Sequence, residues 1–356
     1  MDDFQIKIFQ EVIKSNIGRN LLISPLSIYI ILSLTTNGAK NNTLKEMLSA
    51  LSNKDINQMN EANKLISSEI NNYSSVELAN GIFTIFNPID CFKKIVKEYN
   101  AKIDQLENAE QINKWCSDAT HDKIQKIIEN VNKDDDLMIL INAIYFKGNW
   151  NKEFDPDLTS KKTFMNFNKE PKETDFMYMK TKYYYYEDLE QQVISLDYKN
   201  DNIEALILLP KKENDINNYI ANFKLETYNS IIQQLKRTLV KFSMPKFEIS
   251  FSEELKPYLI SLGMNDAFIS NANFTGMTEE NNIKIGRIIH KTFIKVNEEG
   301  TEAAAITYLE MKKKGSKRSK EKIVIMTVDH PFLFIIRANK LPSGHDMIFA
   351  SKIEYI

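Results

Sequence analysis

The chain has 356 residues, 43% of them hydrophobic and 26% charged, so it is long enough to bury a large core. Its 46 Lys and Arg residues against 48 Asp and Glu residues give a formal net charge of -2, which provides no bulk attraction for nucleic acid or an anionic membrane. The low counts of Gly (10) and Pro (9) exclude collagen-like and low-complexity chains, and no apolar run predicts a transmembrane helix.

Cysteine and histidine usage predicts neither a disulfide framework nor a metal site. Cys91 and Cys116 are the only cysteines, which leaves at most one disulfide open, and the four His residues lie far apart in the sequence. No cofactor is predicted. Because the N-terminus lacks the basic region and apolar run of a secretory signal, we expect a cytoplasmic protein, with non-classical secretion left open.

The first third of the chain is predicted to be mainly helical. Apolar residues recur at helical spacing over residues 4–13. Ser24 and Pro25 precede an apolar stretch at 28–34, which suits a buried helix capped by hydroxyl groups. Another helix is expected to begin at Asn41.

The rest of the chain is rich in strand patterns. Residues 137–146 are nearly all apolar, which predicts a central strand covered on both faces, and the tyrosines at 183–186 are expected to alternate between faces. Further strands are predicted at 193–196, 203–209, 240–250, 323–328, 332–336 and 347–353. Helices come early and strands late without regular alternation, so we predict an α+β fold in a single domain spanning residues 1–356.

One segment, residues 312–322, is strongly basic. It contains seven Lys or Arg residues, one Glu and no apolar side chain, so it cannot bury itself and is predicted to be an exposed loop. The preceding residues 300–307 are small or uncharged except for Glu302. A protease would therefore cleave the chain here first.

Five segments carry a family resemblance. Residues 297–305 read Asn-Glu-Glu-Gly-Thr-Glu-Ala-Ala-Ala and resemble the reactive-loop hinge of the serpins, the serine protease inhibitor family. Residues 20–28, 112–124, 142–150 and 329–337 resemble other serpin motifs in the family's order. The resemblance implies a serpin fold with three β-sheets, about nine helices and an exposed reactive-centre loop at about 298–328 above the main sheet.

The sequence departs from the family pattern at two places. Asp122 stands where the family has Gly before a Lys-Ile pair, and residues 349–352 read Phe-Ala-Ser-Lys in place of Phe-x-Gly-Arg. These departures put the local turn geometry in question.

The resemblance implies suicide inhibition, in which the target protease cleaves the loop, forms an acyl-enzyme and is carried along as the loop inserts into the main sheet. Successive side chains of a strand face opposite sides, so the loop sequence tests whether insertion is feasible. If Thr301 faces inward, no inward residue is charged. The inward set is Thr301, Ala303, Ala305, Thr307, Leu309 and Met311. The pattern permits insertion, because a buried unpaired charge would oppose it.

The hinge implied by the resemblance consists of Glu298, Gly300, Thr301, Ala303, Ala304 and Ala305. Gly300 is expected to supply backbone freedom, and Glu298 is expected to pair with Lys246. Ile306 is bulkier than the residue usual at its position. Without the family context, the Ala-rich spacing also fits a surface helix turn.

Two bonds are candidates for cleavage. Counting the family's usual loop length from Glu298 gives Lys314–Gly315, our first choice, whereas counting back from Pro331 favours Arg318–Ser319. Either bond offers a cation to an acidic specificity pocket, so a trypsin-like protease or one of mixed specificity is the expected partner. Cleavage at Leu309 or Met311 remains an alternative.

The basic run also has other interpretations. It could bind a polyanion, act as a nuclear-localisation signal or be a plain solvated loop. The polyanion contacts would be Lys312, Lys313, Lys314, Lys317, Arg318 and Lys320.

A polar cluster is expected beneath the strands that part. Ser24, Ser27, Asn142 and His290 match positions where serpins keep such a cluster, although helix capping and a core histidine would also explain them. Trp150 is expected at the top of the main sheet where the loop enters, or simply in the core.

No motif of a hydrolase, phosphate-binding loop or zinc peptidase occurs in the sequence, so no catalysis is predicted. The favoured function is inhibition of a serine protease by a monomer that can form loop–sheet polymers. The alternatives are a non-inhibitory serpin acting as carrier, chaperone or storage protein, and a polyanion-binding protein.

Overall fold

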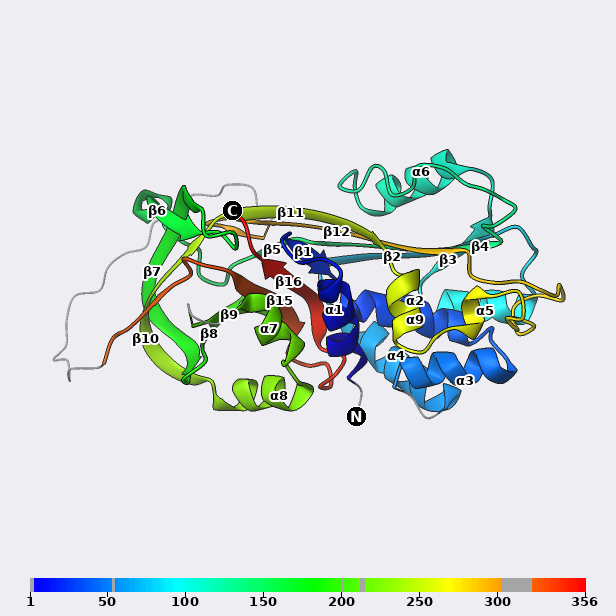
Figure 1. Cartoon of the computed structure of the whole chain (residues 1–356), viewed down its shortest axis with the longest axis horizontal. Coiled ribbons are helices and arrows are strands. Elements are labelled where there is room, and N and C mark those ends of the chain that lie inside the picture. The colour runs from blue at the N-terminus through cyan, green and yellow to red at the C-terminus, as the bar shows by residue number, and fades with distance from the viewer. Residues whose placement is uncertain (1–2, 53–54, 200–201, 212–214, 302–321) are drawn as a thin grey trace.

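A computed structural model describes residues 3–52, 55–199, 202–211, 215–301 and 322–356 (Figure 1). Several predicted site residues lie outside these ranges, and their predictions stay untested. These are the hinge alanines at 303–305, both candidate bonds, Lys314–Gly315 and Arg318–Ser319, and the polyanion residues at 312–320.

The described ranges contain nine α-helices, concentrated in the first third of the chain as predicted. They are α1 (Phe4–Lys14), α2 (Pro25–Thr36), α3 (Asn41–Ala50), α4 (Ile56–Ile70), α5 (Asp90–Glu98), α6 (Ala109–Ala119), α7 (Ile216–Ala221), α8 (Leu225–Gln234) and α9 (Lys256–Ser261). None of them is long and apolar enough to cross a bilayer.

The main sheet has the strand order β3-β2-β4-β12, with β11 on the other side of β12 and two short strands at one end. Its strands are β2 (Val76–Thr84), β3 (Lys102–Gln105), β4 (Met138–Phe146), β5 (Gly148–Asn149), β11 (Phe247–Glu254), β12 (Arg287–Val296) and β13 (Gly300–Thr301). The strand predicted at 137–146 is β4, and all of its residues are buried.

The other strands form a second network in the order β1-β16-β15-β9-β8-β7-β10-β14, with β6 beside β7. They are β1 (Leu21–Ile23), β6 (Ser160–Met165), β7 (Pro171–Glu187), β8 (Gln191–Asp197), β9 (Ile203–Pro210), β10 (Lys236–Pro245), β14 (Val324–Thr327), β15 (Phe332–Ala338) and β16 (Met347–Ile353). Two of the three sheets that the resemblance implies are continuous here, because the long β7 pairs with β10 and also with β8.

One predicted strand is in fact two. Residues 240–250 divide at Lys246 into the end of β10 and the start of β11, which belong to different networks. Pro245 has no N–H to continue the hydrogen-bond ladder, so the chain turns from one sheet into the other at this point.

The central helix α2 fills the space between the two networks. Every one of its residues is buried, and it contacts β2, β4 and β16. The side chain of Ser24 caps it by accepting a hydrogen bond from the backbone N–H of Ser27 at 3.2 Å. A helix without a charged side chain on any face can be covered completely, as the apolar stretch at 28–34 predicts.

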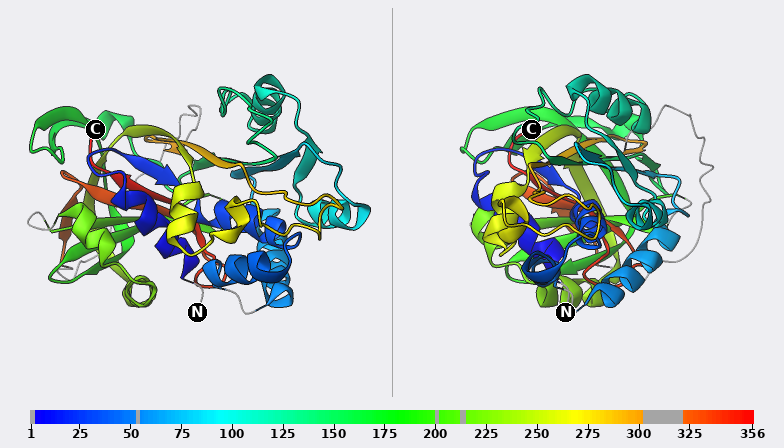
Figure 2. Two further views of the ribbon diagram at one scale, coloured as in Figure 1. Left: turned by 45° about the vertical axis from the view of Figure 1, so that its right-hand side comes forward. Right: turned by 90° about the vertical axis from the view of Figure 1, so that its right-hand side faces the viewer.

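Helix α6 covers the outer face of the main sheet (Figures 1 and 2). Trp115 packs edge-on against Phe83 of β2, with 5.4 Å between ring centroids. The segment that follows α6 adds Ile124, Ile127 and Ile128 to a second apolar core with outward-facing residues of β4. This cover explains why β4 is apolar on both faces.

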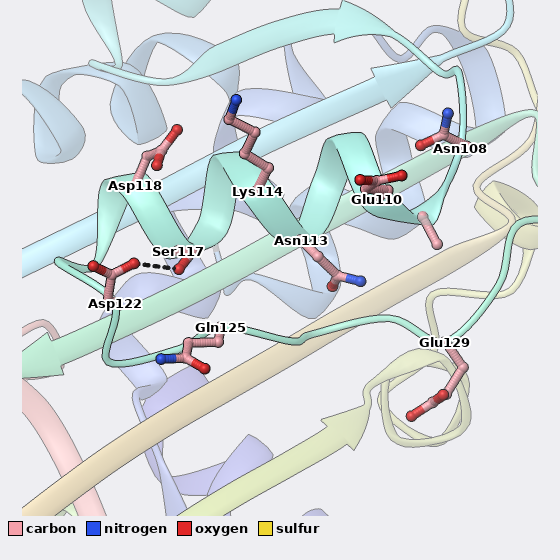
Figure 3. A pocket seen from close by; sticks show the side chains of 10 residues that line it. Asn108, Glu110, Asn113, Lys114, Ser117, Asp118, Asp122, Gln125 and Glu129 are labelled. Carbon is pink, nitrogen blue, oxygen red and sulfur yellow. Dashed lines mark hydrogen bonds between the residues drawn. The ribbon is translucent and has the colours of Figure 1, made fainter.

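Asp122 adopts the backbone conformation that glycine would adopt freely. Its φ angle is 62°, in the left-handed region, and its carboxylate accepts a 2.7 Å hydrogen bond from the Ser117 hydroxyl (Figure 3). The Asp122 N–H also donates to the Ser117 carbonyl at 2.9 Å. The turn in question is therefore kept, because local hydrogen bonds offset a left-handed penalty of about 1–2 kcal/mol.

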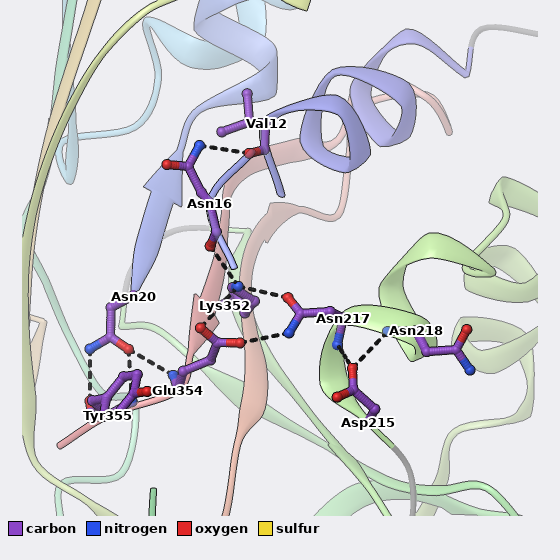
Figure 4. Close-up of polar contacts among 9 residues, drawn as sticks. All are labelled: Val12, Asn16, Asn20, Asp215, Asn217, Asn218, Lys352, Glu354 and Tyr355. Atoms are coloured by element: carbon purple, nitrogen blue, oxygen red, sulfur yellow. Dashed lines mark hydrogen bonds and ion pairs between the residues drawn. The ribbon is translucent and has the colours of Figure 1, made fainter. Parts of the chain in front are cut away.

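Residues 349–352, the second departure, lie in a strand rather than a turn. Ser351 and Lys352 belong to β16, which pairs with β1 and β15. The Lys352 ammonium is fully buried and binds the Asn16 carbonyl at 2.9 Å, the Asn217 amide oxygen at 2.8 Å and the Glu354 carboxylate at 3.0 Å (Figure 4). A buried charge needs this full set of partners, so these contacts join α1, α7 and β16.

Candidate functional site at the seam of the main sheet

The centre of the main sheet is a parallel contact between β4 and β12, which we call the seam. Its register runs from Ile139 opposite Arg287 to Tyr145 opposite Phe293. On their other sides, β4 and β12 are antiparallel to β2 and β11. Parallel pairing is slightly less stable per residue than antiparallel pairing. A new strand antiparallel to both would replace one parallel contact with two antiparallel ones.

A short strand already lies at one end of the seam. Strand β13 pairs antiparallel with β12 through Thr301 opposite Val296, and antiparallel with β5 through Gly300 opposite Asn149. A side chain at Gly300 would place its Cβ 2.1 Å from the Gly148 carbonyl oxygen. Glycine is thus required here for close approach of the two backbones, whereas its predicted role as a flexible hinge stays untested.

Thr301 faces inward, the orientation on which the predicted alternation depends. Its side chain is fully buried, and its hydroxyl lies 2.7 Å from that of Tyr198. Tyr198 stacks on Trp150 with 4.5 Å between ring centroids. The Trp150 indole N–H donates to the Asn297 carbonyl at 3.0 Å, and its backbone N–H donates to Glu299 at 2.9 Å. Trp150 therefore holds the turn between β12 and β13.

The expected Lys246–Glu298 pair lies beside this turn. Lys246 Nζ is 3.1 Å from the Glu298 carboxylate, which also accepts a 2.8 Å hydrogen bond from the Thr159 hydroxyl. Burial alone would raise the pKa of Glu298, but the hydrogen bonds from Thr159 and Lys246 bring it below its ordinary value. The pair joins the end of β10 to the start of the loop.

Replacing Glu298 by Gln should lower the midpoint of thermal unfolding. The loss of a half-buried ion pair is expected to cost about 1–2 kcal/mol, or roughly 2–4 °C, in a thermal melt followed by circular dichroism. The matched control is Glu248→Gln, which removes the exposed pair of Glu248 with Lys295 and should change stability by less than about 0.5 kcal/mol. Equal melting temperatures for E298Q and the control would contradict this role.

The predicted polar residues meet beneath the middle of the seam. Ser27 Oγ donates to Asn142 Oδ1 at 2.7 Å, and His290 Nδ1 lies 2.5 Å from the same oxygen. Asn142 and His290 face each other across the seam. The Asn142 amide also donates to Asn80 Oδ1 at 2.6 Å. Asn80 was missed because the strand at 76–84 was not predicted, although an Asn within an apolar run was a visible signal.

The hydrogen bonds fix the protonation state of His290. The Ser24 backbone N–H donates to His290 Nε2 at 3.0 Å, so Nε2 carries no proton, and Nδ1 donates to Asn142. A second proton would place two donors against each other in a fully buried site. Burial accordingly lowers the pKa of His290 to about 3.

This pKa shift makes stability depend on pH. Below pH 6.5 His290 of the unfolded chain binds a proton, whereas folded His290 stays neutral until about pH 3. The free energy of unfolding therefore falls as pH decreases through this window. In urea titrations between pH 7 and 5, the wild type should lose up to about 1.4 kcal/mol per pH unit more than His290→Gln. The exposed His121→Gln is the control. Parallel pH profiles for wild type and H290Q would exclude the effect.

The far end of the seam is held by an ion pair that sequence analysis did not identify. Arg287, the first residue of β12, binds Asp136 at the entrance to β4 through two hydrogen bonds, of which Nε to Oδ1 measures 2.8 Å. Arg287 also donates to the Asn130 carbonyl at 2.7 Å. Asp136 is buried, so the pair joins the two strands of the seam where the inserting end of a long strand would arrive.

The main sheet thus combines a parallel seam, a short strand at one end and a buried polar cluster beneath it. Comparison with known sequences matches residues 1–353 to the family described as Serpin (serine protease inhibitor). The leukocyte elastase inhibitor of Xenopus laevis is 32% identical, with 96% of this chain and 95% of the relative covered. The chain belongs to the serpin family.

Solved structures agree with this assignment. The thermophilic serpin tengpin in its native state superimposes with a TM-score of 0.91 at 28% identity, covering 100% of this chain and 93% of that one. Human thyroxine-binding globulin, solved in complex with thyroxine, gives a TM-score of 0.88 at 26% identity, covering 99% of this chain and 96% of that one. The predicted serpin fold is therefore confirmed.

Proposed function

We propose that this serpin inhibits a serine protease by suicide trapping, with residues 298–328 as its reactive-centre loop. The observation that carries the proposal is β13, which already lies antiparallel to both β12 and β5 at the end of the seam. After cleavage, the loop would extend this strand between β4 and β12. It would act as a substrate that traps its enzyme, without catalysis of its own.

The register of β13 predicts which seam residues each loop residue would lie opposite after insertion. If the following residues continue β13 without a bulge, Thr307 falls opposite both Asn142 and His290, so a hydroxyl meets the polar cluster. Ala303 falls opposite Phe146 and Ile294, both fully buried, where a small side chain is needed. Polar and apolar positions of the loop thus match those of the seam.

The acidic residues of the loop would also lie opposite basic residues of the flanking strands. In the same register Glu302 falls opposite Lys147 and Lys295, which are both exposed. Glu310 falls opposite Arg287, the cation that closes the far end of the seam. Opposite charges on directly paired strand residues stabilise a sheet, so insertion gains electrostatic contacts as well as hydrogen bonds.

The proposed target accepts a basic residue at Lys314–Gly315, or alternatively at Arg318–Ser319. The inhibitory name of the Xenopus relative supports inhibition, whereas the hormone complex of thyroxine-binding globulin supports a carrier as the alternative. We propose that the protein acts in the cytoplasm, since both cysteines are free thiols and Cys91 is exposed.

The function is tested by mixing the protein with trypsin-like and chymotrypsin-like serine proteases. We expect an adduct that survives denaturing electrophoresis and a released peptide that begins at Gly315 or, for the alternative bond, Ser319. Clean cleavage without an adduct by every protease would refute inhibition and favour a non-inhibitory serpin.

A charge on the inward face should convert the inhibitor into a substrate. Ala303→Glu would bury a carboxylate between Phe146 and Ile294, so insertion should slow and the stoichiometry of inhibition should rise about tenfold or more. The control Ala304→Glu would face outward, where Lys123 lies over the ring of Tyr145 at 5.8 Å. Equal stoichiometries for A303E and A304E would contradict the proposed register.

The Arg287–Asp136 pair should limit spontaneous insertion of the uncleaved loop. Asp136→Asn removes the pair, so the seam should open more readily and activity should be lost about tenfold faster during incubation, with a gain in heat stability of the converted form. The control is the exposed neighbour Asp135→Asn. Identical lifetimes of inhibitory activity in the two variants would show that this end of the seam does not control insertion.

A further inference from the structure

One outward sheet face of the second network is strongly basic. It is formed by β7, β10 and β14, at the end of the molecule opposite α5 (Figure 1). We call it the basic face and define it by its outward residues, which are Lys180, Lys182, Tyr184, Arg237, Leu239, Lys241, Ile323 and Ile325. A net charge of -2 for the whole chain makes this concentration of cations a local feature.

The strand register places like charges against each other. Lys180 is directly opposite Lys241, and Arg237 is opposite Tyr184 on the same pair of strands. Like charges in this position repel, which lowers the stability of the sheet. Neither Lys180 nor Lys241 has an ion pair within the part of the chain that the structure describes. An anionic partner would relieve the repulsion.

Lys162 of β6 extends the row of cations. Its ammonium lies 5.8 Å from the ring centroid of Phe176 and 6.0 Å from that of Tyr178, and it donates to the Ser243 hydroxyl at 2.8 Å. Tyr178 and Ser243 are paired residues of β7 and β10. The positive charge therefore continues across the face towards β6.

Exposed apolar side chains lie among these cations. Ile325 is 64% exposed and sits beside Lys241, Tyr184 is 48% exposed and sits beside Arg237, and Ile323 is 42% exposed. A sulfated or phosphorylated chain would pair with the cations but leave the isoleucines in water. Aromatic, aliphatic and arginine side chains together are typical of a protein interface, so an acidic protein surface fits this face better than a polyanion.

The position of the basic face, next to the proposed reactive-centre loop, indicates which protein carries this acidic surface. Strand β14 begins at Val324, at the end of the proposed reactive-centre loop. A protease bound to that loop would be held close to β14 and the strands beside it, because β14 continues directly from the loop. We infer that the basic face is a secondary docking surface for an acidic surface of the protease caught at the loop, which accelerates encounter by electrostatic attraction. This inference rests on the proposed function.

The test compares an anionic and a cationic trypsin isoform, which share specificity for basic residues but differ in surface charge. The variant Lys180→Glu/Lys241→Glu should slow association with the anionic isoform about tenfold at low ionic strength, with a smaller effect at high salt. Association with the cationic isoform should not slow. The double reversal keeps like charges opposite each other, so thermal stability should stay unchanged.

The matched control is Lys94→Glu/Lys97→Glu, which makes the same charge change on exposed residues of α5 at the other end of the molecule. If both double variants slow association with the anionic isoform equally, net charge alone acts. If wild type and K180E/K241E associate with that isoform at equal rates, the proposed docking surface is overturned. A loss of retention on a sulfated polysaccharide column, with unchanged association rates, would assign the face to polyanions instead.

A failure of the proposed function can be told apart from a failure of the docking surface. If neither isoform forms an adduct with the wild type, inhibition is refuted. The docking surface is then measured with anionic trypsin whose catalytic Ser is replaced by Ala, immobilised for binding. A dissociation constant about tenfold weaker for K180E/K241E than for the α5 control supports the surface, and equal constants refute it.

Discussion

The structure depends on one contact at the centre of the main sheet, the parallel pairing of β4 with β12. Three separate sets of side chains close it along its length. Trp150 and the Lys246–Glu298 pair hold one end, the cluster around Asn142 and His290 holds the middle, and Arg287 with Asp136 holds the other end. Each set makes polar contacts, so each could exchange partners if the strands separated as proposed, whereas interdigitated apolar side chains would lose their packing without replacement.

Much of the fold could be predicted because it follows from local patterns. The nearly continuous apolarity of residues 137–146 indicated a strand covered on both faces, and Ser24 with Pro25 marked the start of a buried helix. The alternation that put Thr301 inward agrees with its burial. Those features needed only strand or helix periodicity, which a single sequence contains.

What could not be predicted depends on partners far apart in the chain. Arg287 and Asp136 are separated by 151 positions, and nothing near either residue indicates the other. The need for glycine at residue 300 comes in addition from the Gly148 carbonyl, which lies close only after the strands have paired. The division of 240–250 between two sheets likewise depends on where the neighbouring strands lie.

Helix α6 has a consequence for the speed of any strand insertion. Asn113 ties α6 to the segment after it by accepting from the backbone N–H groups of Ile127 and Ile128 at 2.8 and 3.0 Å, and Lys291 of β12 binds the Lys126 carbonyl of that segment. This cover lies on the outer face of the seam, so in the proposed mechanism it would have to lift before the strands could part and would settle again afterwards.

Two outward positions of an inserted strand, Ile306 and Tyr308, would then lie under the cover rather than in water. Ile306 would fall beside Ala143 and Tyr308 beside Ile141, against the second apolar core. The bulk of Ile306 would thus become buried surface gained as α6 closes over the new strand. Lifting α6 is a local unfolding event, and its rate would compete with hydrolysis of the acyl-enzyme. Tighter packing of α6 would lengthen the lifetime of the native state, whereas looser packing would favour trapping of the protease. A few apolar side chains outside the loop would therefore set the balance between native-state lifetime and trapping efficiency.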